Sequence, residues 1–531
     1  MKKNDIYEIV IEDIGNDGEC IGHIYEGETE AGMTIFVKDT VVGDEIKVRI
    51  VKVKKRYAYG RLEEILKPSP YRMDAVCPKE RQCGGCVLMH MDYQKQLDYK
   101  WNKVKNCLER IGGIEDAGAL MEPVCGMDNP YHYRNKMQFP VGLSKDGRVE
   151  IGFSTGELMV CVVINGKRKQ FGGSAVEQEW ADCIRKAVEE YNESGQADGK
   201  QMVLKSLTLN YNTEKTNWIL GERCDTLYGA DSITDFIGDI RFKISPLSFY
   251  QVNPAQTKVL YDKAVSYAGL TGDEVVWDMY CGIGTISLCL AKHAKKVYGV
   301  EIVPQAIDDG RENAACNGIE NATFLCGKAE KIVPAFYNGT LDHAASGDMT
   351  GNVDMQEGRH PDVVVVDPPR KGCDSALLDT IEQMKPKRMV YVSCDPATLA
   401  RDIAILVQKG FVLEKVGVVD QFGHSGHVET VVLLSQRKAD DYVEVELELD
   451  EFDVTSAESK ATYAEIKDYV AAHNDGMKVS NLYISQVKRK CGIEVGENYN
   501  LPKSEDSRQP QCPVEKEKAI RDALEHFGMV K

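Results

Sequence analysis

The feature that most constrains the fold is a regular alternation of short apolar runs and helical patterns between residues 248 and 437. The apolar runs are rich in Val, Ile and Leu, and the segments between them repeat apolar residues at helical spacing. Strands that alternate with helices in this way form a mostly parallel sheet covered by helices on both faces. The runs that we expect to be strands are 274–279, 296–301, 322–326, 362–366, 389–393, 411–419 and 428–434. The region is therefore predicted to be a doubly wound α/β domain of about seven strands.

A glycine turn follows the first of these strands, in the segment Asp278-Met-Tyr-Cys-Gly282-Ile-Gly284. Glycines let the backbone approach a ligand closely, and the helix that follows presents free amide groups. The next strand ends at Glu301, whose carboxylate can accept hydrogen bonds from both ribose hydroxyls of a nucleoside. The alternative ligand is a nicotinamide dinucleotide, but the turn lacks the full GxGxxG pattern and Asp367-Pro-Pro is no part of that pattern. The combination favours S-adenosylmethionine.

Two later strands each lead to a group that can take part in chemistry. The strand at 389–393 is followed by Cys394, and Glu429 belongs to the last strand. Uracil C5 is a weak nucleophile toward a sulfonium methyl group, but addition of a thiolate to C6 activates it, and a base must then remove the C5 proton. Cys394 and Glu429 supply the thiol and the base that this reaction needs. Taken alone, Cys394 would be read as a small buried hydrophobe and Glu429 as a surface charge.

The 17 cysteines of the chain bear on where the protein works. No apolar run reaches the roughly 18 residues of a transmembrane helix, and the start of the chain has no apolar signal region. We therefore expect a soluble cytoplasmic protein, monomeric and without a membrane partner, whose thiols stay reduced and serve metal binding or catalysis.

The loop Cys77-x5-Cys83-Gly-Gly-Cys86 lacks the apolar periodicity of a packed segment, which favours a metal. From spacing alone, zinc and iron are equally good candidates.

The net charge of −18 argues, by itself, against a nucleic-acid partner. Its distribution weakens that argument, because residues 440–453 carry eight acids and no base and behave as a solvated linker. By contrast, residues 47–61 form a basic run that is interrupted by Tyr57 and Tyr59. This run is either an RNA-binding surface or a solvent-facing strand.

The pattern along the chain divides it into five parts. Residues 1–68 hold five short alternating strands between Gly-rich turns, which is typical of a small barrel of the OB type. The other parts are a central domain of mixed, mostly β pattern at 69–247, the α/β domain at 248–437, the acidic linker at 438–455 and a small helical extension at 456–531. A helix at 93–111 should pack on the α/β domain, and the extension should have helices at 459–473, 481–490 and 514–528.

Five motifs resemble those of the RNA uracil-5-methyltransferases and occur in the order found in that family. They are Phe249-Tyr-Gln-Val-Asn253, Asp278-Met-Tyr-Cys-Gly-Ile-Gly284, Asp367-Pro-Pro-Arg-Lys-Gly372, Ser393-Cys-Asp-Pro-Ala-Thr-Leu-Ala-Arg-Asp402 and Gly426-His-Val-Glu429. The resemblance extends to about Arg437 and implies a class I methyltransferase domain with Cys394 as nucleophile and Glu429 as base. It also implies that the cofactor, S-adenosylmethionine, is lined by Gln251, Tyr280, Thr285, Glu301 and Asp367.

The cysteine loop resembles the [4Fe-4S] loop of the ribosomal-RNA branch of this family. That resemblance implies a structural [4Fe-4S] cluster in the central domain, with Cys77, Cys83, Cys86 and, from the family pattern, Cys161 as ligands. Methyl transfer from a sulfonium needs no electron, which is why the cluster is expected to be structural.

The first 68 residues resemble the TRAM domain, which implies RNA binding and makes Tyr57 and Tyr59 candidates for stacking on unpaired bases. Arg134 and Lys136 lie in a further family motif, Tyr-Arg-Asn-Lys, and are candidate RNA contacts. A TRAM domain together with the cysteine loop implies 23S ribosomal RNA as the partner, with an unpaired or flipped uridine as target. Transfer RNA is the alternative substrate, and a non-catalytic RNA-binding iron–sulfur protein is the alternative from another class.

Overall fold

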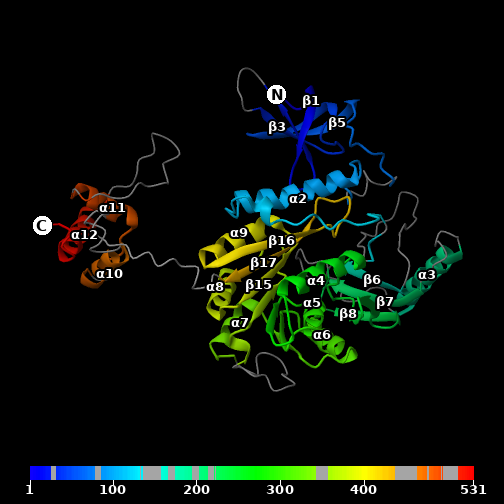
Figure 1. Ribbon diagram of the computed structural model, residues 1–531. Helices are drawn as coiled ribbons and strands as arrows, with labels where there is room; N and C mark the ends of the chain where they lie inside the picture. Colours follow the sequence, from blue (N-terminus) through cyan, green and yellow to red (C-terminus); the bar gives the residue numbers. More distant parts are fainter. Residues whose placement is uncertain are drawn as a thin grey trace. The chain divides into compact units, whose positions relative to one another are not determined.

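The computed structural model resolves the chain into two units, residues 1–438 and 439–531 (Figure 1). We describe each unit by itself. The residues that the structure describes are 1–25, 32–77, 85–131, 133–135, 157–165, 174–193, 203–212, 220–221, 223–341, 357–436, 463–474, 477–491, 493 and 512–530. Within these ranges, no helix is long and apolar enough to cross a membrane.

The N-terminal part of the first unit is a closed barrel in the strand order β1-β2-β3-β5-β4. Its strands are β1 (Ile6–Ile14), β2 (Cys20–Ile24), β3 (Met33–Val37), β4 (Glu45–Val53) and β5 (Tyr57–Lys67). All pairs are antiparallel except β3 with β5. Alternate residues such as Ile35, Ile46 and Val48 are fully buried inside the barrel, which explains the period-two pattern of the sequence.

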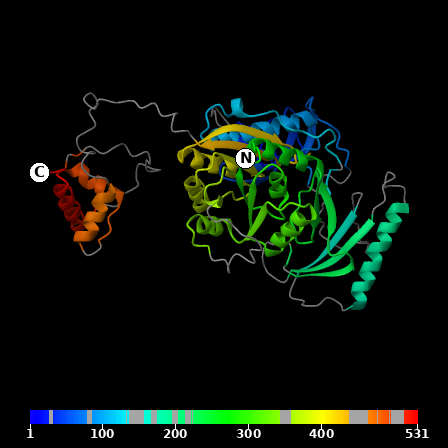
Figure 2. The same cartoon turned by 60° about the horizontal axis from the view of Figure 1, so that its bottom comes forward.

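The central part holds α2 (Tyr93–Arg110), the 3-10 helix η1 (Ala117–Leu120) and two small sheets. A three-stranded sheet has the order β6-β7-β8, formed by β6 (Glu157–Asn165), β7 (Val203–Asn212) and β8 (Arg223–Gly229), and α3 (Ser174–Glu193) packs on it (Figure 2). A hairpin follows, made of β9 (Ile233–Ile237) and β10 (Ile240–Ile244). The sequence pattern did not predict α3, although its buried residues Ala181 and Val188 are seven apart, a helical spacing.

The α/β part contains a seven-stranded sheet in the order β13-β12-β11-β14-β15-β17-β16. Its strands are β11 (Val275–Met279), β12 (Lys296–Glu301), β13 (Ala322–Cys326), β14 (Val363–Val366), β15 (Arg388–Ser393), β16 (Phe411–Val419) and β17 (Glu429–Gln436). They lie within two residues of the runs that the sequence predicts. The strands from β11 to β15 are parallel, and β17 runs antiparallel to both β15 and β16.

Helices cover both faces of this sheet (Figure 1). They are α4 (Pro254–Ala268), α5 (Thr285–Ala291), α6 (Pro304–Cys316), α7 (Ala329–Tyr337), α8 (Ser375–Met384) and α9 (Pro396–Gln408), with the 3-10 helix η2 (Glu357–Arg359) before β14. In β14, Val364 and Val366 belong to the core on one face, whereas Val363 and Val365 belong to the core on the other. Burial on both faces explains why the parallel strands read as continuous apolar runs. Helix α2 packs on α9 and adds Val104 to the first of these cores.

The second unit consists of three helices around their own apolar core. They are α10 (Tyr463–His473), α11 (Asn481–Lys490) and α12 (Val514–His526). Ile466, Ile484 and Ile520 are fully buried in this core, one from each helix. The predicted start of the first helix at residue 459 and the acidic linker lie outside the described residues.

Candidate active site

Strand register brings Cys394 and Glu429 together at one edge of the sheet. In the antiparallel ladder between β15 and β17, Ser393 pairs with Thr430, so the next positions along the two strands are Cys394 and Glu429. Glu429 is 4 % exposed, whereas Cys394 is partly exposed. Asp367 follows β14, the neighbour of β15 on its other side, at the same edge. Residues 27 or more positions apart in the sequence therefore meet because the sheet orders their strands this way.

The turn that carries Cys394 is held by its own neighbours. Asp395 caps α9, and its Oδ1 accepts hydrogen bonds from the amides of Ala397 at 2.9 Å and Thr398 at 3.2 Å. The amide of Asp395 donates to Ser393 Oγ at 3.1 Å. A capped helix start with proline at its first position fixes the direction in which the chain leaves β15. The thiol is thus positioned at a rigid junction between a strand and a helix.

Burial dominates the electrostatics of this edge. It raises the pKa of the Cys394 thiol to about 11, an effect that the Glu429 and Asp367 carboxylates reinforce and the Arg370 guanidinium opposes. Burial likewise holds the pKa of Glu429 well above its usual value, with Asp367 adding to the shift and Arg370 again opposing it. It also raises the pKa of Asp367 to about 7. Two carboxyl groups and a thiol that crowd one another favour their neutral forms, so a cation placed among them would favour ionisation.

The glycine turn after β11 is open on its inner side. Gly282 has a φ of +55° and Gly284 a φ of +81°, values that residues with a Cβ rarely adopt. A Cβ on Gly284 would lie 2.8 Å from the Phe324 ring, whereas a Cβ on Gly282 would meet no atom within 4 Å. Tyr280 also has a positive φ, of 71°, and its hydroxyl donates to Glu330 Oε1 at 3.4 Å. The turn therefore presents backbone to a space that a ligand can fill.

Two carboxylates flank this turn. The Oε2 atom of Glu301 accepts from the amide of Gly282 at 3.2 Å, and its Oε1 accepts from the amide of Val303 at 2.9 Å. Each carboxylate oxygen has a second lone pair, so Glu301 can still accept from ribose hydroxyls. Asp278 is fully buried; its Oδ2 accepts from Ser287 Oγ, but its Oδ1 has no hydrogen-bond partner among the described residues. A buried acceptor without a partner beside an open glycine turn fits a ligand that supplies a donor, as S-adenosylmethionine does.

Asp278 predicts a stability that depends on pH. Burial raises its pKa to about 7, although Ser287 opposes the shift. Between about pH 4 and about pH 7 the folded protein keeps a proton that the unfolded chain loses. The contribution of Asp278 to the free energy of unfolding should therefore fall as pH rises through this window, by up to about 4 kcal/mol, and be lost above it. Urea unfolding without cofactor should show this fall in the wild type and a flatter profile in Asp278→Asn, while the exposed control Asp262→Asn keeps the wild-type profile. Equal profiles for Asp278→Asn and wild type would contradict the argument.

Gln251 and Thr285, predicted from the resemblance to line the cofactor, lie on segments next to the glycine turn. Thr285 is the first residue of α5, and its Oγ1 is 3.0 Å from the hydroxyl of Tyr261. Gln251 is buried, and its Oε1 accepts from Gln421 Nε2 at 3.5 Å. Sequence reasoning missed Tyr261 and Gln421 as neighbours of the site. No local signal marks them, because each reaches the site only through the packing of α4 and the loop before β17.

Sequence reasoning also gave Arg370 no role in the site, although this residue stands in the motif Asp-Pro-Pro-Arg. Its exposed side chain lies close enough to Cys394 and Glu429 to lower the pKa of both groups. A cation in the turn after a strand that ends in Asp367 could have been proposed from the sequence, since parallel strands end at one edge of the sheet.

The loop between β16 and β17, residues 420–428, leads into Glu429 and is bonded to α2. Lys100 of α2 is fully buried, forms an ion pair with Asp420 and donates to the carbonyl oxygen of Phe422 at 2.8 Å. Tyr93, also on α2, donates to Asp420 Oδ2 at 2.6 Å. A buried ion pair is costly to break from one side, by about 3–5 kcal/mol, so it fixes the loop against the helix.

The same loop meets the barrel. The Nζ atom of Lys103 on α2 donates to the carbonyl oxygens of Asn16, in the turn after β1, and Gly426, at 2.7 Å and 2.9 Å. A Cβ on Gly426 would lie 3.1 Å from the backbone carbon of Asp17. The loop that carries the chain into Glu429 is thus in contact with the barrel, as well as with α2.

The predicted metal ligands are not brought together in the part of the chain that the structure describes. Cys83 lies outside the described residues, while Cys77 and Cys86 are partly exposed on either side of it. Cys161 lies on β6, and its thiol forms a hydrogen bond with the Cys224 thiol that helps to lower the pKa of Cys224 to about 6. No group of three or more metal-binding side chains occurs among the described residues. The described cysteines alone therefore do not form a four-thiolate site.

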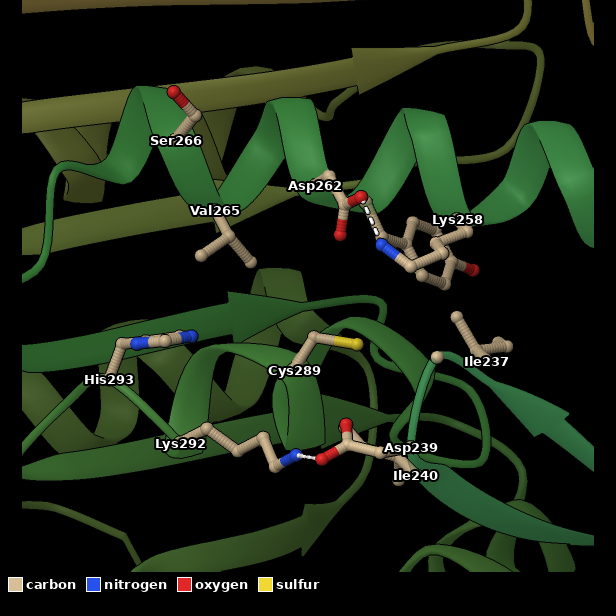
Figure 3. A pocket seen from close by; sticks show the side chains of 12 residues that line it. Ile237, Asp239, Ile240, Lys258, Asp262, Val265, Ser266, Cys289, Lys292 and His293 are labelled. Atoms are coloured by element: carbon tan, nitrogen blue, oxygen red, sulfur yellow. Dashed lines mark hydrogen bonds and ion pairs between the residues drawn. The ribbon is translucent and has the colours of Figure 1, made fainter.

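A cavity of about 570 Å³ lies elsewhere, between α4, the end of α5 and the β9–β10 hairpin (Figure 3). Cys289 faces it, and the Lys258–Asp262 and Lys292–Asp239 ion pairs flank it. Neither Cys394, Glu429 nor the glycine turn lines this cavity. It is therefore separate from the candidate active site.

Two known protein families match the first unit, one toward each of its ends. Residues 232–437 match the family described as tRNA (Uracil-5-)-methyltransferase, and residues 2–62 match the TRAM domain. The second match covers β1 to β4 and the first part of β5, which confirms the prediction of a TRAM-like barrel.

Relatives and a solved structure agree with these matches. The chain is 42 % identical over 479 residues to an uncharacterized RNA methyltransferase of Bacillus cereus, covering 82 % of this chain and 98 % of the relative. It is 41 % identical over 479 residues to one of Clostridium acetobutylicum, with the same coverage. The crystal structure of the Pyrococcus abyssi tRNA (uracil-54, C5)-methyltransferase in complex with S-adenosyl-L-homocysteine matches 81 % of this chain and 100 % of its own, with a TM-score of 0.54 and 23 % identity, which confirms the methyltransferase fold. The chain therefore belongs to the S-adenosylmethionine-dependent RNA (uracil-5-)-methyltransferases that carry a TRAM domain.

Proposed function

We propose that the protein methylates C5 of a uridine in 23S ribosomal RNA through a covalent bond between Cys394 and C6 of the base. The observation that carries this proposal is the position of Cys394 and Glu429 just beyond the Ser393–Thr430 pair of β15 and β17, beside Asp367 at the edge where the glycine turn lies. A thiol and a base within one strand spacing can act on adjacent atoms of one pyrimidine ring, C6 and C5.

The proposed reaction has three steps on the base. The Cys394 thiolate adds to C6, and the electron pair of the C5–C6 double bond moves toward O4 as an enolate. C5 then attacks the methyl group, whose bond to sulfur breaks with its electrons staying on the departing sulfide. Glu429 takes the C5 proton, the double bond re-forms and the Cys394–C6 bond breaks, so the thiolate is regenerated and the proton leaves through Glu429.

S-adenosylmethionine supplies the activated methyl group and a positive charge. We propose that Glu301 holds its ribose hydroxyls, and that the Gly282–Gly284 turn, Asp278 and Tyr280 bound the rest of its site, with Gln251, Thr285 and Asp367 beside it. Support comes from the open backbone of the turn and from the unpaired Oδ1 of Asp278. A sulfonium near Asp367 would favour the ionised forms of Asp367, Glu429 and Cys394, which are otherwise disfavoured by burial.

The choice of ribosomal RNA rests on the TRAM barrel together with the cysteine loop. A second candidate is transfer RNA, which is favoured by the description of the matched family and by the substrate named for the Pyrococcus protein. Mapping of 5-methyluridine in both RNA classes, from cells with and without the gene, separates the two. Loss of a modified uridine from 23S ribosomal RNA alone supports the proposal, and loss from transfer RNA alone contradicts it.

We propose in addition that Cys77, Cys83 and Cys86 hold an iron–sulfur cluster whose fourth ligand is Cys161. The spacing of the first three supports this, whereas the contact between Cys161 and Cys224 makes Cys224 the natural control. Protein purified without oxygen should contain close to four irons and four sulfides per chain. Cys161→Ser should lose this iron and Cys224→Ser should keep it. Iron loss in Cys224→Ser alone would assign the fourth ligand to Cys224, and zinc without sulfide in the wild type would exclude the cluster.

The basic run of the barrel is divided by its ion pairs into two sets. Lys47 pairs with Glu64 at 3.0 Å, and Arg49 and Arg61 both pair with Glu63 at 2.8 Å. The remaining basic residues lie exposed at the β4–β5 hairpin tip and make no ion pair with any residue that the structure describes. They are Lys52, Lys54, Lys55 and Arg56. We therefore assign RNA contacts to the hairpin tip.

Next to the tip, Tyr57 and Tyr59 form an aromatic cluster with Phe36, and the two tyrosine rings are 5.6 Å apart. Such a cluster offers a face on which an unpaired base can stack.

Replacing Lys52, Lys54 and Lys55 together by Ala should weaken RNA binding and flatten its dependence on salt. Each lost phosphate contact lowers the magnitude of the log–log slope by about 0.7 for single-stranded RNA, so three lost contacts lower it by about 2. The control triple variant with Lys47, Arg49 and Arg61 replaced by Ala removes the same charge from paired positions and should change the slope far less. Equal slopes for the two variants would show that the hairpin tip is not the contact.

A further inference from the structure

Three cations and an imidazole lie near the candidate active site. They are Lys103 on α2, Arg134 in the central part, Arg370 after β14 and His427 in the loop before Glu429. We call this set the basic pocket. Arg134, Arg370 and His427 are exposed, and Lys103 is partly exposed. None of the three cations forms an ion pair with a described residue, in a chain whose net charge is −18.

The ring of Phe422 joins two members of the basic pocket. The guanidinium carbon of Arg134 is 5.9 Å from the centre of this ring, and the His427 ring meets it edge to face at 5.9 Å. Tyr133, which also contacts Arg134 at 5.9 Å, donates its hydroxyl to the carbonyl oxygen of Gly423 at 3.2 Å. Aromatic contacts on both sides hold the guanidinium in place without neutralising it.

Lys103 differs from Lys100, its neighbour one turn away on α2. The charge of Lys100 is neutralised by Asp420, whereas Lys103 donates only to two backbone carbonyl oxygens. Burial lowers the pKa of Lys103, and Arg370 lowers it further, although Asp17 and Asp395 oppose the shift. An ammonium group that is partly buried without a carboxylate partner gains stability from an anionic ligand.

The basic pocket adjoins the reactive groups. The carbonyl oxygen of Arg370 accepts a hydrogen bond at 3.1 Å from Thr398 Oγ1, in the first turn of the helix that follows Cys394, and His427 precedes Glu429 by two residues. Partial burial of the ring lowers the pKa of His427, and the charges of Arg370, Lys103, Lys100 and Arg134 lower it further. The neutral imidazole keeps an N–H that can donate to an oxygen. The donors near the reactive groups are therefore two guanidinium groups, an ammonium group and an imidazole N–H.

We propose that the basic pocket binds a phosphodiester group adjoining the target uridine, on the strand whose base enters the space beside Cys394. The inference rests on the proposed function and specifies which part of the RNA the basic pocket binds. A nucleotide that leaves its stack exposes its phosphates on the side from which the base enters, and fixing a phosphate there orients the base for addition at C6. Guanidinium groups suit this task because their donors match two phosphate oxygens.

Protection of Cys394 from alkylation tests the proposal without an RNA substrate. The rate of iodoacetamide modification at Cys394 is read by peptide mass spectrometry, with uridine or uridine 3′,5′-bisphosphate as the probe. The bisphosphate carries both phosphates that flank a nucleotide within a strand. It should protect at a concentration at least about tenfold below that of uridine, as expected for charge-assisted hydrogen bonds.

Variants of the basic pocket separate phosphate binding from base binding. Arg134→Gln and Lys103→Met should each raise the half-protecting concentration of the bisphosphate about tenfold and leave that of uridine unchanged. Arg134→Lys should retain part of the wild-type affinity for the bisphosphate. The control Lys387→Gln removes a cation at the opposite end of β15 and should change neither value. Equal protection by both ligands in the wild type, or no protection by the bisphosphate at its solubility limit, would overturn the proposal.

Protection by uridine distinguishes a loss of phosphate binding from a structural change at the base site. If Arg134→Gln and Lys103→Met weaken protection by uridine as much as by the bisphosphate, they act on the base site and the proposal is wrong. Covalent trapping with RNA that contains 5-fluorouridine tests the proposed function separately. Trapping that succeeds while the bisphosphate gives no advantage would refute only the basic pocket, whereas failure to trap would refute the covalent mechanism.

Discussion

Replacing Cys394 by Ala should abolish methyl transfer, with a loss of roughly four orders of magnitude or more, while S-adenosylmethionine binding stays close to that of the wild type. The reason is that the thiol acts on the base and lies beyond the glycine turn that we assign to the cofactor. Single-turnover assays with labelled methyl donor measure the first effect, and calorimetric titration of the cofactor measures the second.

The same substitution has a matched control in Cys373→Ala. The Cys373 thiol is buried in the core next to Tyr391 and has a pKa raised by burial to about 12, so its loss should affect packing and leave the chemistry intact. RNA that contains 5-fluorouridine should form an adduct with the wild type and with Cys373→Ala, because fluorine cannot leave as a cation when the base acts. An adduct with Cys394→Ala, or turnover above a few per cent of wild type, would disprove the assignment of the nucleophile.

Glu429→Gln should slow turnover by about 10²- to 10⁴-fold and, unlike Cys394→Ala, should accumulate a covalent complex with unmodified RNA. Thiol addition and methyl transfer precede proton removal, so losing the base stops the reaction after the Cys394–C6 bond has formed. The complex should survive on a denaturing gel and carry the transferred methyl group.

The glutamine also removes a carboxyl group whose burial favours its neutral form, so folding should not suffer. Thermal unfolding of the variant is therefore the control, and its midpoint should be no lower than that of the wild type. A folded variant that binds RNA but gives no adduct would show that another group is the base.

Much of the α/β domain was predictable because its physical signal is local. Strands such as β14 are buried on both faces and therefore read as short, uninterrupted apolar runs, and glycines after β11 mark a turn that only a small residue can form. The candidate nucleophile and base were predicted from their position at strand ends together with the resemblance of their motifs to a known family, because either residue taken alone would be read as structural.

Other features depend on contacts between distant segments and leave no local trace. The division of the basic run into paired and unpaired cations is one, because it depends on the register that sets Lys47 opposite Glu64 on the neighbouring strand. The basic pocket is another, since Lys103 and Arg370 are more than 260 positions apart in the sequence. The contact between Cys161 and Cys224 likewise joins two strands on either side of β7, and no spacing rule predicts it.

The bonds from α2 to the loop at residues 420–428 limit how far this enzyme can be shortened. The stretch that matches the methyltransferase family, residues 232–437, includes Asp420 but not Lys100 or Tyr93, which neutralise and bond its carboxylate. Expressed alone, that stretch would lose the ammonium and hydroxyl groups that hold Asp420, together with the helix that packs on α9 and β16. The segment bearing α2, although it precedes the methyltransferase domain by more than a hundred residues, therefore belongs to the smallest catalytic fragment.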